Sequence, residues 1–364
     1  MTYLIFRNDG IGDLIVSTPL IKLIKIYDKD PKIHLVCSNR NVEYAYLLKL
    51  NKLIDDYTNI DEYRSFLKKI KFYLKIKAIN VHHIIILRSS HINILMSLLL
   101  KYSFQFTKRL TISSIVPLNL SKKGKNRYKP SRYLINSLFD HYEIIDGRND
   151  YLKSKHIQMF EHYTNLGNKA LKSEISTNDV PYFVPQLLLN EEMFIEATEE
   201  ILKKNKFMVF HFDEKWNSAD YSINEIINLI NGLLEAFNGY IFITHGLFKN
   251  KYFDLVKNEY QFKSNISSNP NCKIYHSVTN KRLFSFNSLK LNELMFLISK
   301  SNLVIEQHGA LTHLASIYKI PVIDLMTKNR INFLSKWKPR DTKMKQLIID
   351  DKEDILKKMK EFIT

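Results

Sequence analysis

Two short stretches of the sequence combine side chains that can bind anions with side chains that can move protons. The first stretch, residues 7–13, reads RNDGIGD and places Arg7, Asp9 and Asp13 around two glycines. A carboxylate in such a turn can take the proton of a hydroxyl group. Asp13 can equally cap the following helix by accepting backbone N–H groups. The spacing alone leaves both roles open.

The second stretch, residues 302–325, reads NLVIEQHGALTHLASIYKIPVIDL. Its polar turn, EQHG at 306–309, separates a short apolar run from a predicted helix. Gly309 and Ala310 are small enough to let a phosphate group approach the free N–H groups at the helix start. His313, in the first turns of that helix, either hydrogen-bonds a ligand or packs in the core. This stretch therefore predicts an anion site.

Both stretches require a strand before the turn and a helix after it. Residues 3–6 form an apolar run typical of a buried parallel strand, and helical spacing begins near residue 14. In open α/β sheets, ligands bind at the carboxyl ends of the strands. The loop does not complete a dinucleotide fingerprint, because Ile15 replaces the third glycine and no acidic residue follows the second predicted strand, 33–37. A nicotinamide or flavin enzyme is therefore disfavoured.

Predicted strands and helices alternate along the rest of the chain, as they do in doubly wound parallel sheets. The further predicted strands are 82–87, 104–107, 110–116, 207–212, 240–244, 273–275, 303–305 and 321–325. The further predicted helices are 42–50, 63–77, 90–100, 152–166, 191–204, 223–237, 251–260, 291–300, 310–318 and 352–362.

A polar connector near residue 180 separates two such series, and a basic loop is predicted at 121–132. We therefore expect an N-terminal domain at 1–180, a C-terminal domain at 181–345 and a closing helical segment at 346–364. The predicted fold class is α/β, with two doubly wound domains facing a central cleft. Such clefts are common binding sites for small ligands.

The composition is that of a soluble globular protein, with 45% hydrophobic and 25% charged residues. No apolar run reaches the roughly 18–20 residues that cross a bilayer. Cys37 and Cys272 lie far apart in the sequence and give neither a disulfide framework nor a metal-ligand spacing. We expect a protein of the reducing cytoplasm.

The formal net charge of +17 would attract nucleic acid, an anionic membrane surface or an acidic substrate. The sequence has no zinc finger, RNA-binding aromatic signature or basic heptad arm, so nucleic acid is not the expected partner. We favour a peripheral contact between a basic face of the protein and the inner face of the cytoplasmic membrane.

Together the two stretches resemble the lipopolysaccharide heptosyltransferases of glycosyltransferase family 9. The N-terminal pattern of that family is R-x-D-x-(I/L)-G-D-x-(I/V/L)-x-(T/S)-x-P, and it is matched by Arg7, Asp9, Ile11, Gly12, Asp13, Ile15, Ser17 and Pro19. The C-terminal pattern is D-(S/T)-G-x-x-H-L-A, followed by a helix and a P-(V/T) strand. It is matched by His313, Leu314, Ala315, Pro321 and Val322, whereas His308 and Ala310 replace the Asp and the Gly.

The resemblance implies a GT-B fold of two Rossmann-like domains and an ADP-heptose donor. It implies that Asp13 is the base that activates the acceptor hydroxyl. The family's aspartate at the position of His308 typically holds hydroxyls of the donor sugar. The family also has a basic residue and a Trp near the donor phosphates, after an H-P-G-(A/S) stretch. Here residues 211–216 read HFDEKW, so Lys215 takes this role or a shifted alignment places Tyr221 there.

The resulting hypothesis is a metal-independent, inverting glycosyltransferase without a cofactor. Asp13 is the predicted base, and Lys215 is predicted to stabilise the departing phosphate. The predicted donor-binding residues are His211, Glu306, His308, Gly309, Ala310 and His313, and the predicted acceptor-binding residues are Arg7, Asp9 and Gly12. The donor would be ADP-heptose or a similar nucleotide-sugar. The acceptor would be an acidic glycolipid, such as the lipopolysaccharide core, or a related cell-surface glycan.

Two alternatives come from other classes of protein. Replacement of the family's aspartate by His308 and the missing Pro-Gly favour a catalytically inactive protein that binds nucleotide-sugars. The high positive charge would also suit a basic nucleic-acid-binding protein, whose affinity would fall steeply with salt.

Overall fold

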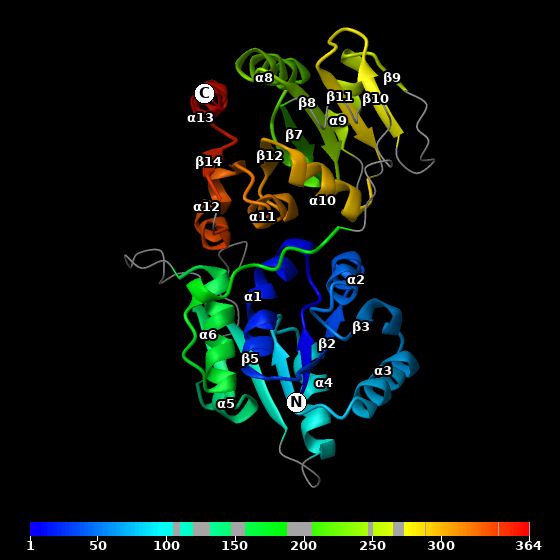
Figure 1. The fold of residues 1–364 in the computed structure, drawn as a ribbon, viewed down its shortest axis with the longest axis vertical. Helices are drawn as coiled ribbons and strands as arrows, with labels where there is room; N and C mark the ends of the chain where they lie inside the picture. Colours follow the sequence, from blue (N-terminus) through cyan, green and yellow to red (C-terminus); the bar gives the residue numbers. More distant parts are fainter. Residues whose placement is uncertain are drawn as a thin grey trace. The chain divides into compact units, whose positions relative to one another are not determined.

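The structure is a computed structural model that describes residues 1–104, 110–118, 132–146, 157–187, 206–246, 250–264, 273–287, 289–340 and 342–363. The chain forms two compact units (Figure 1). The first unit contains Met1–Pro185 with Ser335–Lys338, and the second contains Gln186–Leu334 with Pro339–Thr364. The two units thus separate after Pro185, and the closing helix belongs to the second unit.

The first unit is built on a six-stranded sheet in which every neighbouring pair of strands is parallel. Its strand order is β3-β2-β1-β4-β5-β6. The strands are β1 (Thr2–Phe6), β2 (Lys32–Cys37), β3 (Asp56–Asn59), β4 (His83–Ile86), β5 (Thr111–Leu118) and β6 (His141–Asp146). The chain starts in the middle of the sheet and changes direction between β1 and β4.

Helices cover both faces of this sheet. They are α1 (Ile11–Tyr27), α2 (Val42–Leu50), α3 (Phe66–Ala78), α4 (His91–Phe104), α5 (Arg132–Leu138) and α6 (Met159–Leu171), with short 3-10 turns η1 (Ile60–Tyr63) and η2 (Thr177–Asp179). Apolar residues of α3, α4 and α5 form one core with one face of the strands. Helix α6 packs against α1, where Gly167 lies against Leu20 and Leu23.

The second unit is built on an eight-stranded sheet with the order β14-β13-β12-β7-β8-β11-β10-β9. The strands are β7 (Phe207–Phe212), β8 (Tyr240–His245), β9 (Phe262–Ser264), β10 (Lys273–Ser277), β11 (Leu283–Asn287), β12 (Leu303–Gln307), β13 (Val322–Met326) and β14 (Met344–Ile348). Here the direction of the chain changes between β7 and β12.

The second sheet is doubly wound, as the sequence predicts, but it is not parallel at one edge. Strand β10 pairs antiparallel with both β9 and β11, whereas β11 pairs parallel with β8. Only residues 278–282 connect β10 to β11. A parallel pair requires a crossover of a dozen or more residues, so this short connection forces a hairpin.

The helices of the second unit are α8 (Ile223–Ala236), α9 (Lys251–Glu259), α10 (Leu291–Lys300), α11 (Ala310–Ile317), α12 (Ile331–Leu334) and α13 (Lys352–Ile363), with 3-10 turns η4 (Glu214–Ser218) and η5 (Lys328–Arg330). A further 3-10 turn, η6 (Ser335–Trp337), follows α12 in the sequence but belongs to the first unit. The fully buried Trp216 contacts the rings of Phe210, Phe212 and Tyr252 in the core. This core supports the carboxyl end of β7.

Some predicted segments fall outside the described residues. These are the helix at 191–204, residues 152–156 of the predicted helix 152–166, residues 105–107 of a predicted strand and residues 121–131 of the predicted basic loop. Phe104 itself ends α4, so the predicted strand does not start there. Within the described part of the chain, every helix is too short or too polar to span a bilayer.

Candidate functional site

In each unit, the predicted site residues lie where the strand order changes direction. Residues 7–13 follow β1, and the loop after its neighbour β4 lies at the same edge of the first sheet. In the second unit, Lys215 follows β7 and residues 308–310 follow the neighbouring β12. Ligands of open α/β sheets bind outside the carboxyl ends of the strands at such points.

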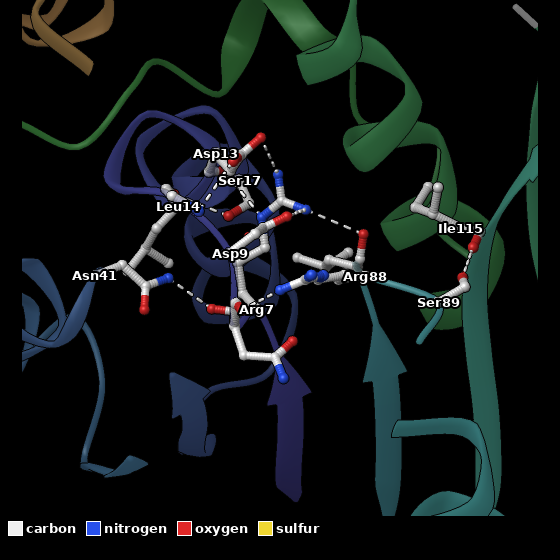
Figure 2. Close-up of polar contacts among 12 residues, drawn as sticks. Arg7, Asp9, Asp13, Leu14, Ser17, Asn41, Arg88, Ser89 and Ile115 are labelled. Atoms are coloured by element: carbon white, nitrogen blue, oxygen red, sulfur yellow. Dashed lines mark hydrogen bonds and ion pairs between the residues drawn. The ribbon is translucent and has the colours of Figure 1, made fainter. Parts of the chain in front are cut away.

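Arg7 is the residue that organises the loop after β1. Only 2% of it is exposed, and its guanidinium donates to the carbonyl oxygen of Leu87 at 3.0 Å, the hydroxyl of Tyr163 at 2.7 Å and the carbonyl oxygen of Asp13 at 3.0 Å. Asn41 donates to the carbonyl oxygen of Arg7 at 2.7 Å (Figure 2). Arg7 therefore connects β1, the end of β4, α6 and the start of α1.

Arg7 also pairs with both predicted carboxylates. Its Nη1 lies 3.1 Å from Oδ2 of Asp9, and its Nη2 lies 3.3 Å from Oδ1 of Asp13 (Figure 2). The other oxygen of Asp13, Oδ2, accepts the backbone N–H of Gly10 at 3.0 Å. Asp13 thus has a capping role, but from the first turn, since the N-cap is Gly10. Its side chain is 30% exposed, and Gly12 beside it is buried.

Asp9 is the more perturbed of the two carboxylates. Burial raises the pKa of Asp9 to about 6, against the opposing effect of Arg7 and Arg88. Among the described residues, no hydrogen-bond donor serves Oδ1 of Asp9. Arg88 also donates to the carbonyl oxygen of Asn8 (Figure 2). Sequence reasoning missed Arg88, although it comes directly after the predicted strand 82–87 and thus at the same sheet edge.

Lys215 joins the two turns of the second unit. Its ammonium lies 2.5 Å from Oδ2 of Asp213, 3.1 Å from the carbonyl oxygen of Gln307 and 2.5 Å from that of His308. These acceptors match the three N–H donors of a lysine. The Lys215 side chain is 27% exposed. Asp213, which sequence reasoning missed, is buried, and this burial raises its pKa.

Gly309 leaves the space that Lys215 occupies. A Cβ atom added to Gly309 would lie 2.8 Å from Nζ of Lys215 and 3.3 Å from Oε2 of Glu306. Ala310 follows as the first residue of α11. Position 309 therefore favours a glycine, because a larger side chain would displace the Lys215 ammonium from the start of this helix.

Glu306 brings a carboxylate to the start of α11. It is buried, and its Oε1 accepts both the backbone N–H and the hydroxyl of Thr312. Burial raises the pKa of Glu306 to about 7, against the opposing effect of Lys215. One of the free N–H groups that a phosphate would use is therefore already bonded to a side chain of the protein.

His308 and His313 lie close together and are both buried. Their rings are 5.7 Å apart and nearly perpendicular. Nδ1 of His308 lies 2.8 Å from Oδ2 of Asp324, and Gln346 donates to the same oxygen at 3.1 Å. Sequence reasoning missed Asp324 and Gln346, which lie at paired positions of β13 and β14. Asp324 thus places a buried carboxylate beside the ring of His308.

His211 is the last residue but one of β7, a strand that is buried along its whole length. Its Nδ1 lies 2.8 Å from the hydroxyl of Thr244, and desolvation lowers its pKa to about 3, so the ring is neutral. Its carbonyl oxygen accepts the indole N–H of Trp216 at 3.1 Å. Tyr221, the alternative to Lys215, donates to the carbonyl oxygen of Ile349 at 2.7 Å from within the core. Of the two, Lys215 lies beside the turn after β12.

The structure thus forms two clusters, one in each unit. Arg7, Asp9, Gly12 and Asp13 form the first, and His211, Glu306, His308, Gly309, Ala310, His313 and Lys215 lie together at the carboxyl ends of β7 and β12 in the second. Among the described residues, no three His, Cys, Asp or Glu side chains are grouped to hold a metal ion. The first cluster contains carboxylates that can accept a proton from a hydroxyl group. The second contains an ammonium group that can bind an anion.

Two doubly wound α/β units, each with its polar cluster at the switch point, define the GT-B fold. Over its full length the chain is similar to the glycosyl transferase family 9 structure from Veillonella parvula, at 12% identity, 97% coverage of that chain and a TM-score of 0.67. It is similar to Escherichia coli heptosyltransferase WaaC with ADP-2-deoxy-2-fluoro heptose, at 13% identity, 99% coverage and a TM-score of 0.62.

The UDP-GlcNAc 2-epimerase of Methanocaldococcus jannaschii has the same fold, at 14% identity, 93% coverage of that chain and a TM-score of 0.55. No protein-family model and no curated protein sequence matches the chain. The resemblance that the two sequence stretches indicated is therefore present in the fold. One fold can support several activities, so the activity has to be argued from the site.

Proposed function

We propose that this chain is a glycosyltransferase that moves a sugar from a nucleotide-sugar onto a hydroxyl group of an acceptor. The observation that carries this proposal is the position of the two clusters, each at the switch point of its own sheet. The first cluster supplies carboxylates, and the second supplies an ammonium beside a helix start. The fold shared with a family 9 glycosyl transferase and a heptosyltransferase supports the same proposal.

The second unit would bind the donor. The pyrophosphate would lie at Gly309, Ala310 and the start of α11, where backbone N–H groups favour an anion. Lys215 would exchange a carbonyl acceptor for a phosphate oxygen and neutralise the charge that grows on the departing nucleotide. His211, Glu306, His308 and His313 would shape the donor site around these groups.

The first unit would bind the acceptor. Asp13 would take the hydroxyl proton as the acceptor oxygen forms its bond to the anomeric carbon. The bond between this carbon and the phosphate oxygen would break on the opposite face, so the configuration inverts and the nucleoside diphosphate leaves. Arg7, Asp9 and Gly12 would hold the loop in place for this step. No cofactor or metal ion is required by this scheme.

The finer assignment is an ADP-heptose-like donor and an acidic glycolipid acceptor, such as a lipopolysaccharide core. A heptosyltransferase of the same fold binds an ADP-heptose analogue, which supports this donor class. The net charge of +17 suits an acidic acceptor. A cytoplasmic location fits a donor of this kind.

A panel of ADP- and UDP-sugars tests the proposal in two stages. A donor at about 100 times its dissociation constant should raise the free energy of unfolding by roughly 2.7 kcal/mol. Donors that bind are then incubated with lipopolysaccharide-core acceptors, and product and nucleoside diphosphate are measured. Asp13→Asn is the matched variant, because its amide oxygen can still accept the N–H of Gly10. We expect it to bind donor and to lose about 10²–10⁴-fold in transfer rate.

Each other outcome contradicts a part of the proposal. Binding without transfer to any acceptor would favour the inactive binding protein. Epimerisation of a UDP-sugar, followed by NMR, would place the chain with the epimerases instead. If no nucleotide-sugar stabilises the protein, the donor assignment of the second unit is wrong.

A further inference from the structure

Helix α3 exposes an apolar stripe to solvent. Phe66 is 76% exposed and Leu67 71%, and Ile70 and Leu74 are also exposed. Residues 66, 70 and 74 follow one another at the four-residue spacing that aligns side chains on one face of a helix. The opposite side of α3 packs in the core. Single exposed apolar residues are ordinary, but a stripe of this length marks an interaction surface.

Helix α4 exposes a second apolar stripe beside the first. Its members are Ile92, Leu95, Leu99 and Tyr102, at helical spacings of three and four residues. The two helices are neighbours, because their inner residues share one core and the hydroxyls of Tyr73 and Ser103 are hydrogen-bonded. Both helices cover the same face of the first sheet. We call the two stripes together the α3–α4 face.

Positive charge is concentrated in the same part of the chain. Residues 63–104, which the structure describes and which include both helices, contain eight Lys and Arg residues and no Asp or Glu. Five of these lysines lie on α3, at positions 68, 69, 71, 75 and 77. The apolar stripe of α3 is thus accompanied by cations without a carboxylate on either helix.

We propose that the α3–α4 face docks onto the surface of an anionic lipid bilayer. Apolar side chains beside lysines are the chemistry of interfacial membrane helices, since the apolar groups enter the acyl boundary while the cations contact the headgroups. Lysine side chains near an anionic leaflet are attracted electrostatically. Nucleic acid would account for the cations but not for the exposed aliphatic stripes. This surface goes beyond the proposed transfer reaction and does not depend on it.

Cosedimentation of the full chain with vesicles tests the proposal. One set of vesicles contains phosphatidylglycerol and phosphatidylcholine, and the other contains phosphatidylcholine alone. We expect at least tenfold stronger binding to the anionic vesicles, with a strong decrease at high salt. The apolar variant is Phe66→Ser with Leu67→Ser, and we expect it to bind at least tenfold more weakly. Leu255→Ser, at an exposed position on α9, is its control and should bind like the native chain.

A charge variant separates the contribution of the lysines. Lys68→Gln, Lys71→Gln and Lys75→Gln together should weaken binding to anionic vesicles at least tenfold. The matched control carries the same three changes at exposed lysines of the second unit, namely Lys263, Lys345 and Lys357, and it should bind distinctly more tightly than the charge variant. Circular dichroism and thermal unfolding check that every variant is folded.

Three results would overturn the proposal. They are equal binding of the native chain to neutral and anionic vesicles, undiminished binding of the Phe66 and Leu67 variant, and absence of vesicle binding. If vesicles are not bound and light scattering shows a dimer that the same variant disrupts, the α3–α4 face is an interface between two copies of the chain. None of these measurements uses a nucleotide-sugar, so their failure is distinguishable from failure of the transferase proposal.

Discussion

Glu306 caps helix α11 through Thr312, whose backbone N–H and hydroxyl both donate to the Glu306 carboxylate. The protein thus places an anionic group of its own at the helix start where the proposed donor would place its pyrophosphate. Because burial raises the pKa of Glu306 to about 7, this group changes charge near neutral pH. A bound diphosphate would favour the neutral form, since two anions at one helix start repel each other.

Diphosphate affinity should therefore depend on pH through Glu306. Below pH 7 the Glu306 carboxyl group is neutral and does not repel the diphosphate. Above pH 7 it is charged in the free protein, and binding must take up a proton. Each further pH unit should therefore weaken binding by up to about tenfold. Titration calorimetry with ADP and UDP at pH 6.5, 7.5 and 8.5 measures this. Glu306→Gln keeps an acceptor for Thr312 and should flatten the dependence. A native affinity that is the same at pH 7.5 and pH 8.5 would contradict the prediction.

Asp9 should give the transfer reaction a second pH dependence. Burial raises the pKa of Asp9 to about 6, so its negative charge is lost as the pH falls through this value. A negative Asp9 pairs with Arg7, which also holds Asp13 in place, so kcat/KM should rise as the pH increases through about 6 and then level off. Asp9→Asn should remove this inflection. The prediction is wrong if the inflection near pH 6 persists in the variant.

Gly309→Ala should detach Lys215 from the turn after β12. The new Cβ would lie 2.8 Å from the ammonium, which must move away from its acceptors and leave the buried Asp213 without its cation. Loss of these charge-assisted bonds should lower the free energy of unfolding by about 1–3 kcal/mol. Denaturant unfolding measures the change. In a Lys215→Met background the same substitution should cost clearly less, and an equal cost in both backgrounds would refute this explanation.

Gly167→Ala should weaken the packing of α6 on α1. The added Cβ would lie 2.5 Å from Cδ2 of Leu23 and 2.6 Å from Cδ1 of Leu20, both of which are buried. Overpacking of this kind costs about 1–3 kcal/mol, of which the better helix propensity of alanine returns up to about 1 kcal/mol. Gly246→Ala is the control, because its nearest neighbouring atom would be 3.8 Å away. A more stable Gly167→Ala protein would show that α6 can move to accept the methyl group.

The sequence was informative where the apolar pattern was strong and local. The predicted bounds 42–50, 207–212 and 291–300 are those of α2, β7 and α10. Edge elements were missed, among them β6 and β14, whose sequences HYEIID and MKQLI contain too few consecutive apolar residues. Their identity as strands depends on pairing with β5 and β13, which no local pattern expresses.

The candidate site residues also differ in whether the sequence alone could predict them. Arg7, Asp9 and Asp13 could be grouped from the sequence because one tight loop carries all three. Arg88 and Asp324 could not, since each comes from a neighbouring strand and its approach depends on strand order and register. The roles of Asp13 and Lys215 in transfer stay predictions. The structure shows only that Asp13 interacts with Arg7 and Gly10, and that Lys215 interacts with Asp213 and the turn after β12.

The buried guanidinium of Arg7 has a consequence for the synthesis of the protein. One of its acceptors, the hydroxyl of Tyr163, is separated from it by 156 residues. At roughly 5–20 residues per second, a ribosome requires on the order of 8–30 s to add that length. Throughout this interval the nascent N-terminus cannot complete the polar network around its arginine, so the loop after β1 acquires its final partner only when α6 has emerged.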